Sequence, residues 1–481
     1  MPEIICQVNP TKLKVTLFAM IFLLFPPPLR SQTVPLNDLS FFRDAGKSWS
    51  IAGQVTADLR EPGTLNTSGG KGILVNRTSK KDHGTDLYSL SEYGDIDLEL
   101  DYLMAAGSNS GIYLQGRYEI QLHDTWGSLR FTSGNNGGIY ERWNNNAPEG
   151  RKGYEGYPPR QNVSRAPGLW QHLKISFKAP VFDARGQKVE SAKMLLVELN
   201  GVVIHKNVEL SGPTRGAISP EERAMGPLRF QGDHGSVAFR NINITSYPEG
   251  RPAETVSQRR GALYPISVNR HSRPVFRSFM DLPEDIRVVH AISVASPYNV
   301  HYTYDADTGM ILQVWRGDFL DATPMWYSRG DGSSRPVGAV TGFGKPSVAL
   351  ARLSSPQDPW IKDTTGTGFR PKGYTLNENN EPVFKYMTYG TLVSDKTMAL
   401  DNGKGVRREI AIDKSLPDMY VRLAEGATIE EVSKGLYLID HNSYYLQLEN
   451  VGELKPRVRE SNGRKELVLP LRSKVTYSIL F

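Results

Sequence analysis

The stretch GDIDLELDYLM, residues 94–104, decides the fold class of this chain. From Ile96 to Tyr102 every second residue is apolar, and the residues between them are acidic. A period of two is typical of a β-strand with one face in a core and the other face toward solvent. The stretch therefore predicts a half-buried strand.

Runs of the same kind recur along the chain, separated by turns rich in glycine. An Asn-Gly pair at Asn200-Gly201 inside one run is the strongest short signal for a β-hairpin. The 45 glycines and 31 prolines also favour many turns over long helices. We therefore predict an all-β protein, whose strands in the first half include SGIYLQG (110–116), RYEIQLHD (117–124), WQHLKISFKAP (170–180), AKMLLVELNGVVIHKNV (192–208) and SVAFRNINITSY (236–247).

The length of 481 residues is too large for one ordinary core and predicts two or three domains. We place a leader at residues 1–32, a first domain at 36–249 and a second β-rich domain, a β-sandwich, at 273–481. The segment between them, 250–272, is rich in Pro, Arg, Ser and Gly and is interpreted as a linker.

The N-terminus has the pattern of a secretory signal peptide. Lys12 and Lys14 precede a short apolar run, Val15–Phe25, and small or polar residues follow near Gln32, where we predict cleavage. The run is shorter than the roughly 20 residues of a membrane helix, so the mature chain is expected to have no membrane span, and an N-terminal membrane anchor is the alternative. We expect a secreted or periplasmic bacterial protein.

The only cysteine, Cys6, lies inside this predicted leader. The mature chain would therefore contain no disulfide, no cysteine nucleophile and no thiolate metal site. A Cys-x-x-Cys-His haem attachment motif is also absent from the sequence. The net charge of +6 is mild, and basic residues alternate with acidic ones, so we do not expect a nucleic-acid partner.

The densest polar cluster is NSGIYLQGRYEIQLHD, residues 109–124. Within its second strand Glu119, Gln121 and His123 share one face. Two interpretations stay open: a concave face that holds a polar ligand, or a solvated outer face. We expect Asp101 on a neighbouring strand, close enough to Glu119 for the two carboxylates to shift each other's pKa.

Two other segments carry polar or aromatic residues without strand periodicity. The segment 133–167 is long, rich in Gly, Asn and Pro, and contains several aromatic residues, so we interpret it as an ordered loop that lines a cleft. The segment RFQGDHG, 229–235, places Gln231, Asp233 and His234 at a glycine-flanked turn. A histidine there is either a base or metal ligand, or an ordinary surface residue.

These motifs, in this order, resemble the 3-keto-disaccharide hydrolase domain family, formerly a domain of unknown function. The resemblance covers roughly residues 38 to 248 and rests on NSGIYLQGRYEIQLHD, LWQHLKISFKAPVFDARGQKV, LNGVVIHKNVELSGPT and GPLRFQGDHGSVAFRNINI. It implies a concanavalin A-like jelly-roll sandwich, the fold of laminarinase-type glycosidases and many lectins.

The resemblance also implies an activity, the elimination of the aglycone from a glycoside that carries a ketone at carbon 3, followed by addition of water. A base removes the proton on carbon 2, and a divalent metal could stabilise the enolate. Glu119 is the first candidate for base or metal ligand and His234 the competitor. By this resemblance the catalytic candidates are Glu119, His234 and Asp101; the substrate-binding candidates are Asn109, Tyr113, Gln115, Arg117, Gln121, Asp124 and Gln231; and the metal-ligand candidates are Glu119, Asp124 and His234.

Two departures from the family pattern concern activity. Gln115 occupies a position that is frequently arginine, and QGDHG contains an extra glycine. A non-catalytic, lectin-like carbohydrate-binding protein is therefore the alternative, and a scaffolding role for the second domain is a third possibility.

The second half resembles only uncharacterised β-rich regions of exported bacterial proteins. It contains a cluster around Trp315 and Trp326, for which we consider a sugar platform or, preferably, core aromatics with ion-paired turns.

Overall fold

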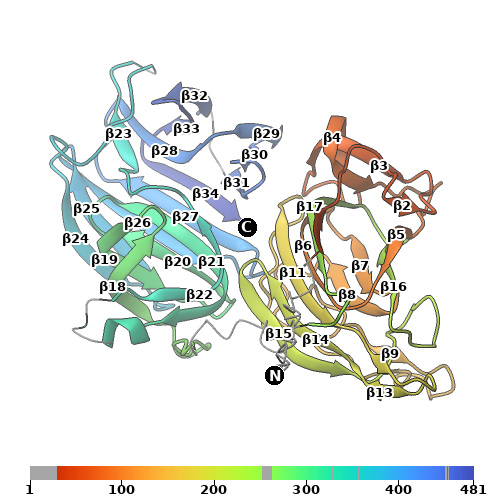
Figure 1. Cartoon of the computed structure of the whole chain (residues 1–481). Helices are drawn as coiled ribbons and strands as arrows, with labels where there is room; N and C mark the ends of the chain where they lie inside the picture. The colour runs from red at the N-terminus through yellow and green to blue at the C-terminus, as the bar shows by residue number, and fades with distance from the viewer. Residues whose placement is uncertain are drawn as a thin grey trace, which may run out of the picture.

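The computed structural model describes residues 30–251, 263–326, 330, 332–355, 357–449, 452 and 454–481. The predicted leader, 1–32, lies almost entirely outside these residues, as does much of the predicted linker. Among the described residues the regular structure is β, apart from one 3-10 turn, η1 (Thr323–Trp326). The all-β prediction is confirmed, and two bodies of strands lie side by side (Figure 1).

The first body is a sandwich of two antiparallel sheets. We call the larger one the outer sheet; its eight strands are β15 (Val202–Leu210), β14 (Ala192–Leu199), β11 (Gln171–Lys178), β6 (Ile96–Met104), β17 (Val237–Ser246), β4 (Asn66–Asn76) and β3 (Trp49–Thr56) in order, with β1 (Arg30–Thr33) paired to β17. The smaller one, here the site sheet, has five strands: β2 (Phe42–Arg43), β5 (Leu87–Tyr93), β16 (Gly226–Phe230), β7 (Asn109–Leu114) and β8 (Tyr118–His123). Two short ribbons complete this body, β9 (Arg142–Trp143) with β10 (Gly153–Tyr154) and β12 (Val181–Phe182) with β13 (Lys188–Glu190).

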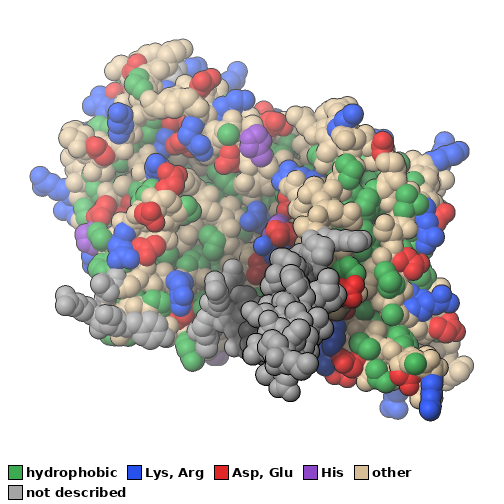
Figure 2. Space-filling model, in the orientation of Figure 1, with side chains coloured by type: hydrophobic (Ala, Val, Ile, Leu, Met, Phe, Trp, Pro, Cys, Tyr) green, Lys and Arg blue, Asp and Glu red, His purple; other side chains and the backbone are tan. Residues whose placement is uncertain are grey.

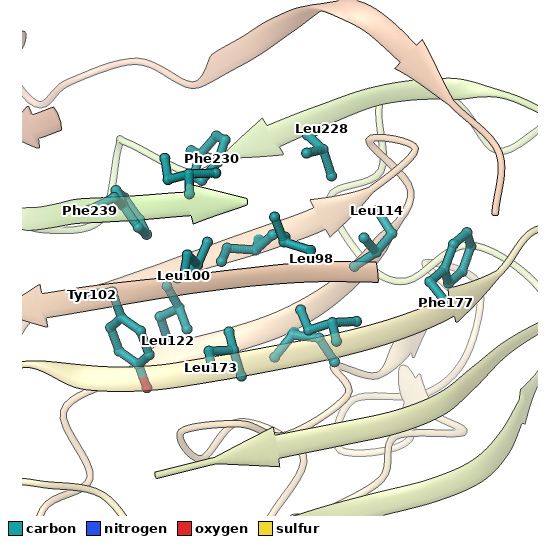
Figure 3. Close-up of a cluster of buried hydrophobic side chains, with 14 of the residues drawn as sticks. Leu98, Leu100, Tyr102, Leu114, Leu122, Leu173, Phe177, Leu228, Phe230 and Phe239 are labelled. Atoms are coloured by element: carbon teal, nitrogen blue, oxygen red, sulfur yellow. The ribbon is translucent and has the colours of Figure 1, made fainter. Parts of the chain in front are cut away.

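The core of this sandwich follows the period of two that the sequence shows. On β6, Leu98, Leu100 and Tyr102 are at most 1% exposed, whereas Asp97 and Glu99 between them are partly exposed. The buried side chains meet those of β8, β11, β16 and β17, including Leu122, Leu173, Phe177, Phe230 and Phe239 (Figure 3). Burying such residues is the main stabilising contribution to the sandwich.

The predicted hairpin is present. Strands β14 and β15 pair through a turn at Asn200 and Gly201, whose φ angles are 51° and 82°. Positive φ at both central residues is the requirement of a type I′ turn, which explains the Asn-Gly pair.

The second body has three antiparallel sheets. One holds β18 (Val275–Leu282), β19 (Ile286–Val294), β20 (Val300–Asp305), β21 (Met310–Asp321) and β22 (Arg335–Gly342), and a second holds β23 (Leu350–Arg352), β28 (Met419–Gly426), β33 (Arg464–Pro470) and β32 (Arg457–Ser461). The third has eight strands: β24 (Arg370–Leu376), β25 (Pro382–Thr388), β26 (Thr391–Ala399), β27 (Gly405–Ile412), β34 (Lys474–Leu480), β31 (Tyr444–Glu449), β30 (Leu436–Ile439) and β29 (Ile429–Ser433). All three contribute to one core.

The two bodies pack against each other through an apolar cluster. Ala166 and Leu169 of the first body meet Leu436, Leu438 and Tyr445 of the second. The Tyr445 hydroxyl also donates a hydrogen bond to the Ala57 carbonyl, 3.0 Å away. The interface therefore combines apolar burial with directional bonds.

The surface is mixed in charge on the face shown in Figure 2, where Lys and Arg side chains lie among Asp and Glu. No helix in the described part of the chain is long and apolar enough to cross a membrane.

Candidate active site

The polar cluster of the sequence lies on the face of the site sheet that points away from the core. Antiparallel registers place Tyr113 of β7 opposite Glu119 of β8, and Arg229 of β16 opposite Tyr113. Their neighbours in sequence, such as Ile112, Ile120 and Phe230, fill the core. The three polar side chains therefore form one row across adjacent strands.

Glu119 is buried although it is on the outward face. Only 1% of the residue is exposed, and neither carboxylate oxygen accepts a hydrogen bond of regular geometry from any described residue. Burial raises the pKa of the Glu119 carboxyl from 4.5 to about 8, and the neighbouring Tyr113 and Arg229 offset only part of the increase. A solvated outer face, the simpler of our two interpretations, is therefore wrong for this residue.

A short crossing segment, residues 214–216, covers the row. The Thr214 hydroxyl accepts a hydrogen bond from the Glu119 amide at 3.1 Å, and the Arg215 carbonyl accepts one from the Tyr113 hydroxyl at 3.2 Å. The Gly216 carbonyl accepts one from Arg229 Nη1 at 2.5 Å. Each bond joins one residue of the crossing segment to the row, so the segment excludes water from this side of Glu119.

Arg229 supplies a positive charge within this row. Its guanidinium carbon lies 3.8 Å from the centre of the Tyr113 ring, and its Nε lies 2.9 Å from Asp86 Oδ2. Arg229 is 6% exposed. Neither Arg229 nor Asp86 was predicted from the sequence, although Arg229 precedes Gln231 by two positions and an alternating backbone places both on one face.

The Glu119 carboxylate lies over Gly111 of β7. A Cβ atom built at Gly111 would overlap Glu119 Oε1. Glycine inside a strand often marks such a close approach, and it is the absence of a side chain at Gly111 that makes room for the carboxylate.

Gly111→Ala is therefore expected to displace Glu119 and to lower the free energy of unfolding by about 1–3 kcal/mol through overpacking. Urea unfolding at pH 6 measures the change. Gly134→Ala is the matched control, because a Cβ there makes only ordinary contacts, the nearest at 3.7 Å. Equal stability losses in the two variants would contradict the close approach.

Hydrogen-bond acceptors without donors surround Gly111. Gln231 donates its amide to the Gly111 carbonyl at 2.9 Å, Gln121 is paired with Gly111 across β7 and β8, and Asn109 is two residues away on β7. Asn109 Oδ1 and Gln231 Oε1 are buried and have no hydrogen-bond donor among the described residues. Together with Glu119 they form an acceptor set around the glycine, which a ligand with several hydroxyl donors would satisfy.

Part of the predicted loop, 133–167, borders this face. Its residues 133–141, here the covering segment, extend the site sheet beyond β8, because Ile139 bridges to Ile120 and the Tyr140 amide donates to the Glu119 carbonyl at 3.1 Å. Tyr140 therefore lies next to Glu119 at the edge of the sheet. The aromatic residues of the loop pointed to a role for this segment, but the sequence did not single out Tyr140.

His234 lies at the turn after β16 and is exposed. Its Nδ1 is 2.5 Å from Asp233 Oδ1 and 3.4 Å from Gln231 Nε2, and the Asn109 amide donates to the His234 carbonyl at 3.4 Å. His234 is thus attached to the acceptor set through its backbone and through Gln231.

The remaining candidates make local structural contacts. Asp124 Oδ2 accepts a hydrogen bond from the Gly107 amide and Oδ1 accepts one from the Trp126 amide, so this carboxylate closes a turn after β8. His123 Nδ1 lies 2.9 Å from the Gly134 carbonyl. Within the described ranges no three His, Cys, Asp or Glu side chains meet as a metal-binding group.

Asp101 is not next to Glu119, and that expectation was wrong. Strand β6 pairs with β11 and β17 in the outer sheet, and its acidic residues Asp97, Glu99 and Asp101 point away from the core. Asp101 binds His172 Nδ1 at 2.7 Å, Asn241 Nδ2 at 2.8 Å and Arg240 Nε at 3.2 Å. The thickness of the sandwich, about 10 Å between sheets, separates it from the site sheet.

Gln115 and Arg117 also do not face the acceptor set. They belong to the turn between β7 and β8, where Gln115 has a φ of 54°. Gln115 Nε2 donates to the Ala224 carbonyl at 2.8 Å, and Arg117 Nε donates to the Glu221 carbonyl at 2.7 Å. They hold the loop before β16 in place.

Trp315 and Trp326 of the second body lie in different environments. Trp315 is completely buried and stacks on Phe319, whereas Trp326 is 78% exposed at the end of η1. The core interpretation holds for Trp315.

The sequence that forms the first body matches the profile of one family. Residues 37–245 match the profile of the 3-keto-alpha-glucoside-1,2-lyase-like domain. This part of the chain belongs to that family. The lyase-like domain contains the whole site sheet, the crossing segment and the covering segment, and it ends within β17.

Three crystal structures of Parabacteroides distasonis ATCC 8503 proteins, provisionally named glycosyl hydrolases, are similar to the chain. The first is 23% identical over 50% of this chain and all of its own, with a TM-score of 0.31. The second is 19% identical over 45% of this chain and all of its own, with a TM-score of 0.30. The third is 16% identical over 42% of this chain and 88% of its own, with a TM-score of 0.24. None is close enough to transfer residues. No curated protein matches the chain.

Proposed function

We propose that this chain is an exported enzyme that cleaves glycosides oxidised to a ketone at carbon 3, with Glu119 as the base. The buried Glu119 carboxylate, held over Gly111 without a regular hydrogen-bond donor, is the observation that carries the proposal. Charged groups are rarely buried without partners unless a site uses them, and strongly shifted acids cluster at active sites.

The first step is proton transfer from carbon 2 of the sugar to the Glu119 carboxylate. The ketone at carbon 3 takes up the electron pair as an enolate, and the positive charge of Arg229 favours this anion. The enolate then re-forms the ketone while the carbon 1–oxygen bond breaks, so that the aglycone leaves. Addition of water across the resulting carbon 1–carbon 2 double bond completes a net hydrolysis.

The leaving oxygen needs a proton, and His234 is the group to which we assign this transfer. Its Nδ1 faces Asp233, and its Nε2 has no partner among the described residues, so the imidazole is held while one nitrogen stays available. The acceptors Asn109 Oδ1 and Gln231 Oε1 would bind sugar hydroxyls beside it. Because Glu119 is closed off from solvent in this arrangement, the sugar has to displace neighbouring side chains on binding.

Incubation with a 3-keto-glucoside and its unoxidised parent tests the proposal. We expect release of the aglycone from the keto form alone, because only the ketone acidifies the proton on carbon 2. Binding of both sugars without turnover would instead favour the lectin-like alternative. Cleavage of both at similar rates would exclude elimination and favour ordinary glycoside hydrolysis.

The pH profile distinguishes a base from an acid. If Glu119 acts as the base, kcat/KM should rise about tenfold per pH unit and level off near pH 8, where its carboxyl ionises. Initial rates between pH 5 and pH 9.5 on the keto substrate measure this. A rate that falls through pH 8 would assign Glu119 the role of a general acid.

A further inference from the structure

Besides its backbone bonds to β8, the covering segment is held by one buried asparagine. The Asn136 amide donates to Thr125 Oγ1 at 3.2 Å, and its Oδ1 accepts hydrogen bonds from the Tyr102 hydroxyl at 2.9 Å and from the His123 amide at 3.3 Å. The next residue, Gly137, donates its amide to the Gln121 carbonyl at 2.7 Å. Asn136 thus joins the covering segment to β8 and to the turn that follows β8.

That turn is bound to the second body. Trp126, one residue after Thr125, donates from Nε1 to the Phe481 carbonyl at 2.8 Å, and its ring centre lies 4.9 Å from Lys404 Nζ. The Trp126 side chain packs against the apolar cluster between the two bodies. The Phe481 carbonyl also accepts a hydrogen bond from the buried Arg316 at 3.2 Å, so the acceptor is itself fixed.

The contacts form a continuous route from the second body to the Glu119 strand. It runs from Phe481 through Trp126, then through Thr125 to Asn136, and from there to the pairing of the covering segment with β8. Within the first body the same turn is held by Asn162, whose Nδ2 donates to the Thr125 and Ser128 carbonyls at 3.0 Å, and by Asp124, which accepts hydrogen bonds from the Gly107 and Trp126 amides.

We propose that Trp126 is a positioning residue through which the C-terminal body holds the covering segment against β8 and, through it, the crossing segment over Glu119. The two segments are joined because the Glu141 carbonyl of the covering segment accepts a hydrogen bond from the Arg215 amide of the crossing segment at 2.8 Å. The inference deepens the proposed function and assigns the second body a part in the same site. It does not require contact between Trp126 and substrate. Coupling between the two bodies is measured at Glu119 itself.

The ionisation of Glu119 can be followed without substrate. For the full chain and for each variant, urea unfolding is compared with that of the same chain carrying Glu119→Gln, from pH 4 to pH 9. The pH dependence of the difference reports the Glu119 pKa. The groups that act on this carboxyl besides burial, Tyr113, Arg229, Asp86 and Asp233, stay unchanged throughout.

Trp126→Ala should lower the Glu119 pKa by one unit or more toward 4.5, because water reaches the carboxyl. Trp126→Phe, which keeps the ring but lacks the donor to Phe481, should give a smaller decrease and serves if the alanine variant does not fold. Arg60→Gln is the control across the same interface, since it loses only the Lys434 carbonyl and Gln447; its Glu119 pKa should not move.

An unchanged pKa in both Trp126 variants would overturn the inference, as would an equal decrease in Arg60→Gln. Because this readout needs no turnover, a chain inactive on keto sugars would remove the proposed function while leaving this test intact.

Discussion

Glu119→Gln is expected to stabilise the chain at alkaline pH. The native pKa of about 8 exceeds the 4.5 of an ordinary glutamate, so the folded chain binds more protons than the unfolded chain between these values. The contribution is fully present below pH 4.5 and is lost as pH rises through 8. At about 1.4 kcal/mol per pKa unit, the loss at pH 9 is of order 3–5 kcal/mol, and glutamine avoids it.

The same variant is expected to lose activity on the keto substrate by about 10²- to 10⁴-fold, the usual contribution of a general base. Stability and activity therefore move in opposite directions, as they do where a site holds a strained or poorly solvated group. Urea unfolding at pH 5 and pH 9, together with initial rates, measures both effects.

Glu209→Gln is the matched control, because this carboxylate is 61% exposed and pairs with Lys193 at 3.4 Å on the surface. It should change neither activity nor the slope of stability with pH. If Glu119→Gln also left activity and the slope of stability with pH unchanged, the Glu119 carboxyl would have to be solvated and the active site would lie elsewhere.

The sequence predicted the strands well because alternation records burial directly. In β6 and β8 the apolar residues are in the core. The prediction that Glu119 and Gln121 share one face of their strand is correct. Alternation does not reveal what lies on the other face. Glu119 is buried by the crossing segment, residues 214–216, which is almost a hundred positions away in sequence. That segment has no periodic pattern from which its position could be predicted.

Which strands pair with which was the other feature that the sequence did not reveal. Asp101 precedes the polar cluster closely in sequence, which suggested an adjacent strand, yet the chain passes from the outer sheet to the site sheet between β6 and β7. Gln115 and Arg117 were grouped with β7 and β8 although they belong to the turn, where strand parity no longer applies. Gly111 carried a readable signal, a glycine within a strand, and it now marks the centre of the site.

The largest effect on stability is expected in the second body, at the buried ion pair of Asp395 and Arg408. Their side chains are 0% and 4% exposed, and Arg408 Nε and Nη2 lie 3.0 and 2.5 Å from the two carboxylate oxygens. Arg408 Nη1 also donates to the Tyr477 hydroxyl on β34 at 3.2 Å. Asp395→Asn leaves a buried charge without its partner and should lower the free energy of unfolding by about 3–5 kcal/mol.

Asp281→Asn is the comparison, since its pair with Arg287 is about half exposed on both sides and should contribute less than about 1 kcal/mol. The double variant Asp395→Leu, Arg408→Met should recover most of the loss, because it removes both charges instead of one. Strand β34 leads directly to Phe481, the acceptor for Trp126, so Asp395→Asn should also loosen the docking of the two bodies. If Asp395→Asn lowered the free energy of unfolding as little as Asp281→Asn does, water would already reach the pair of Asp395 and Arg408.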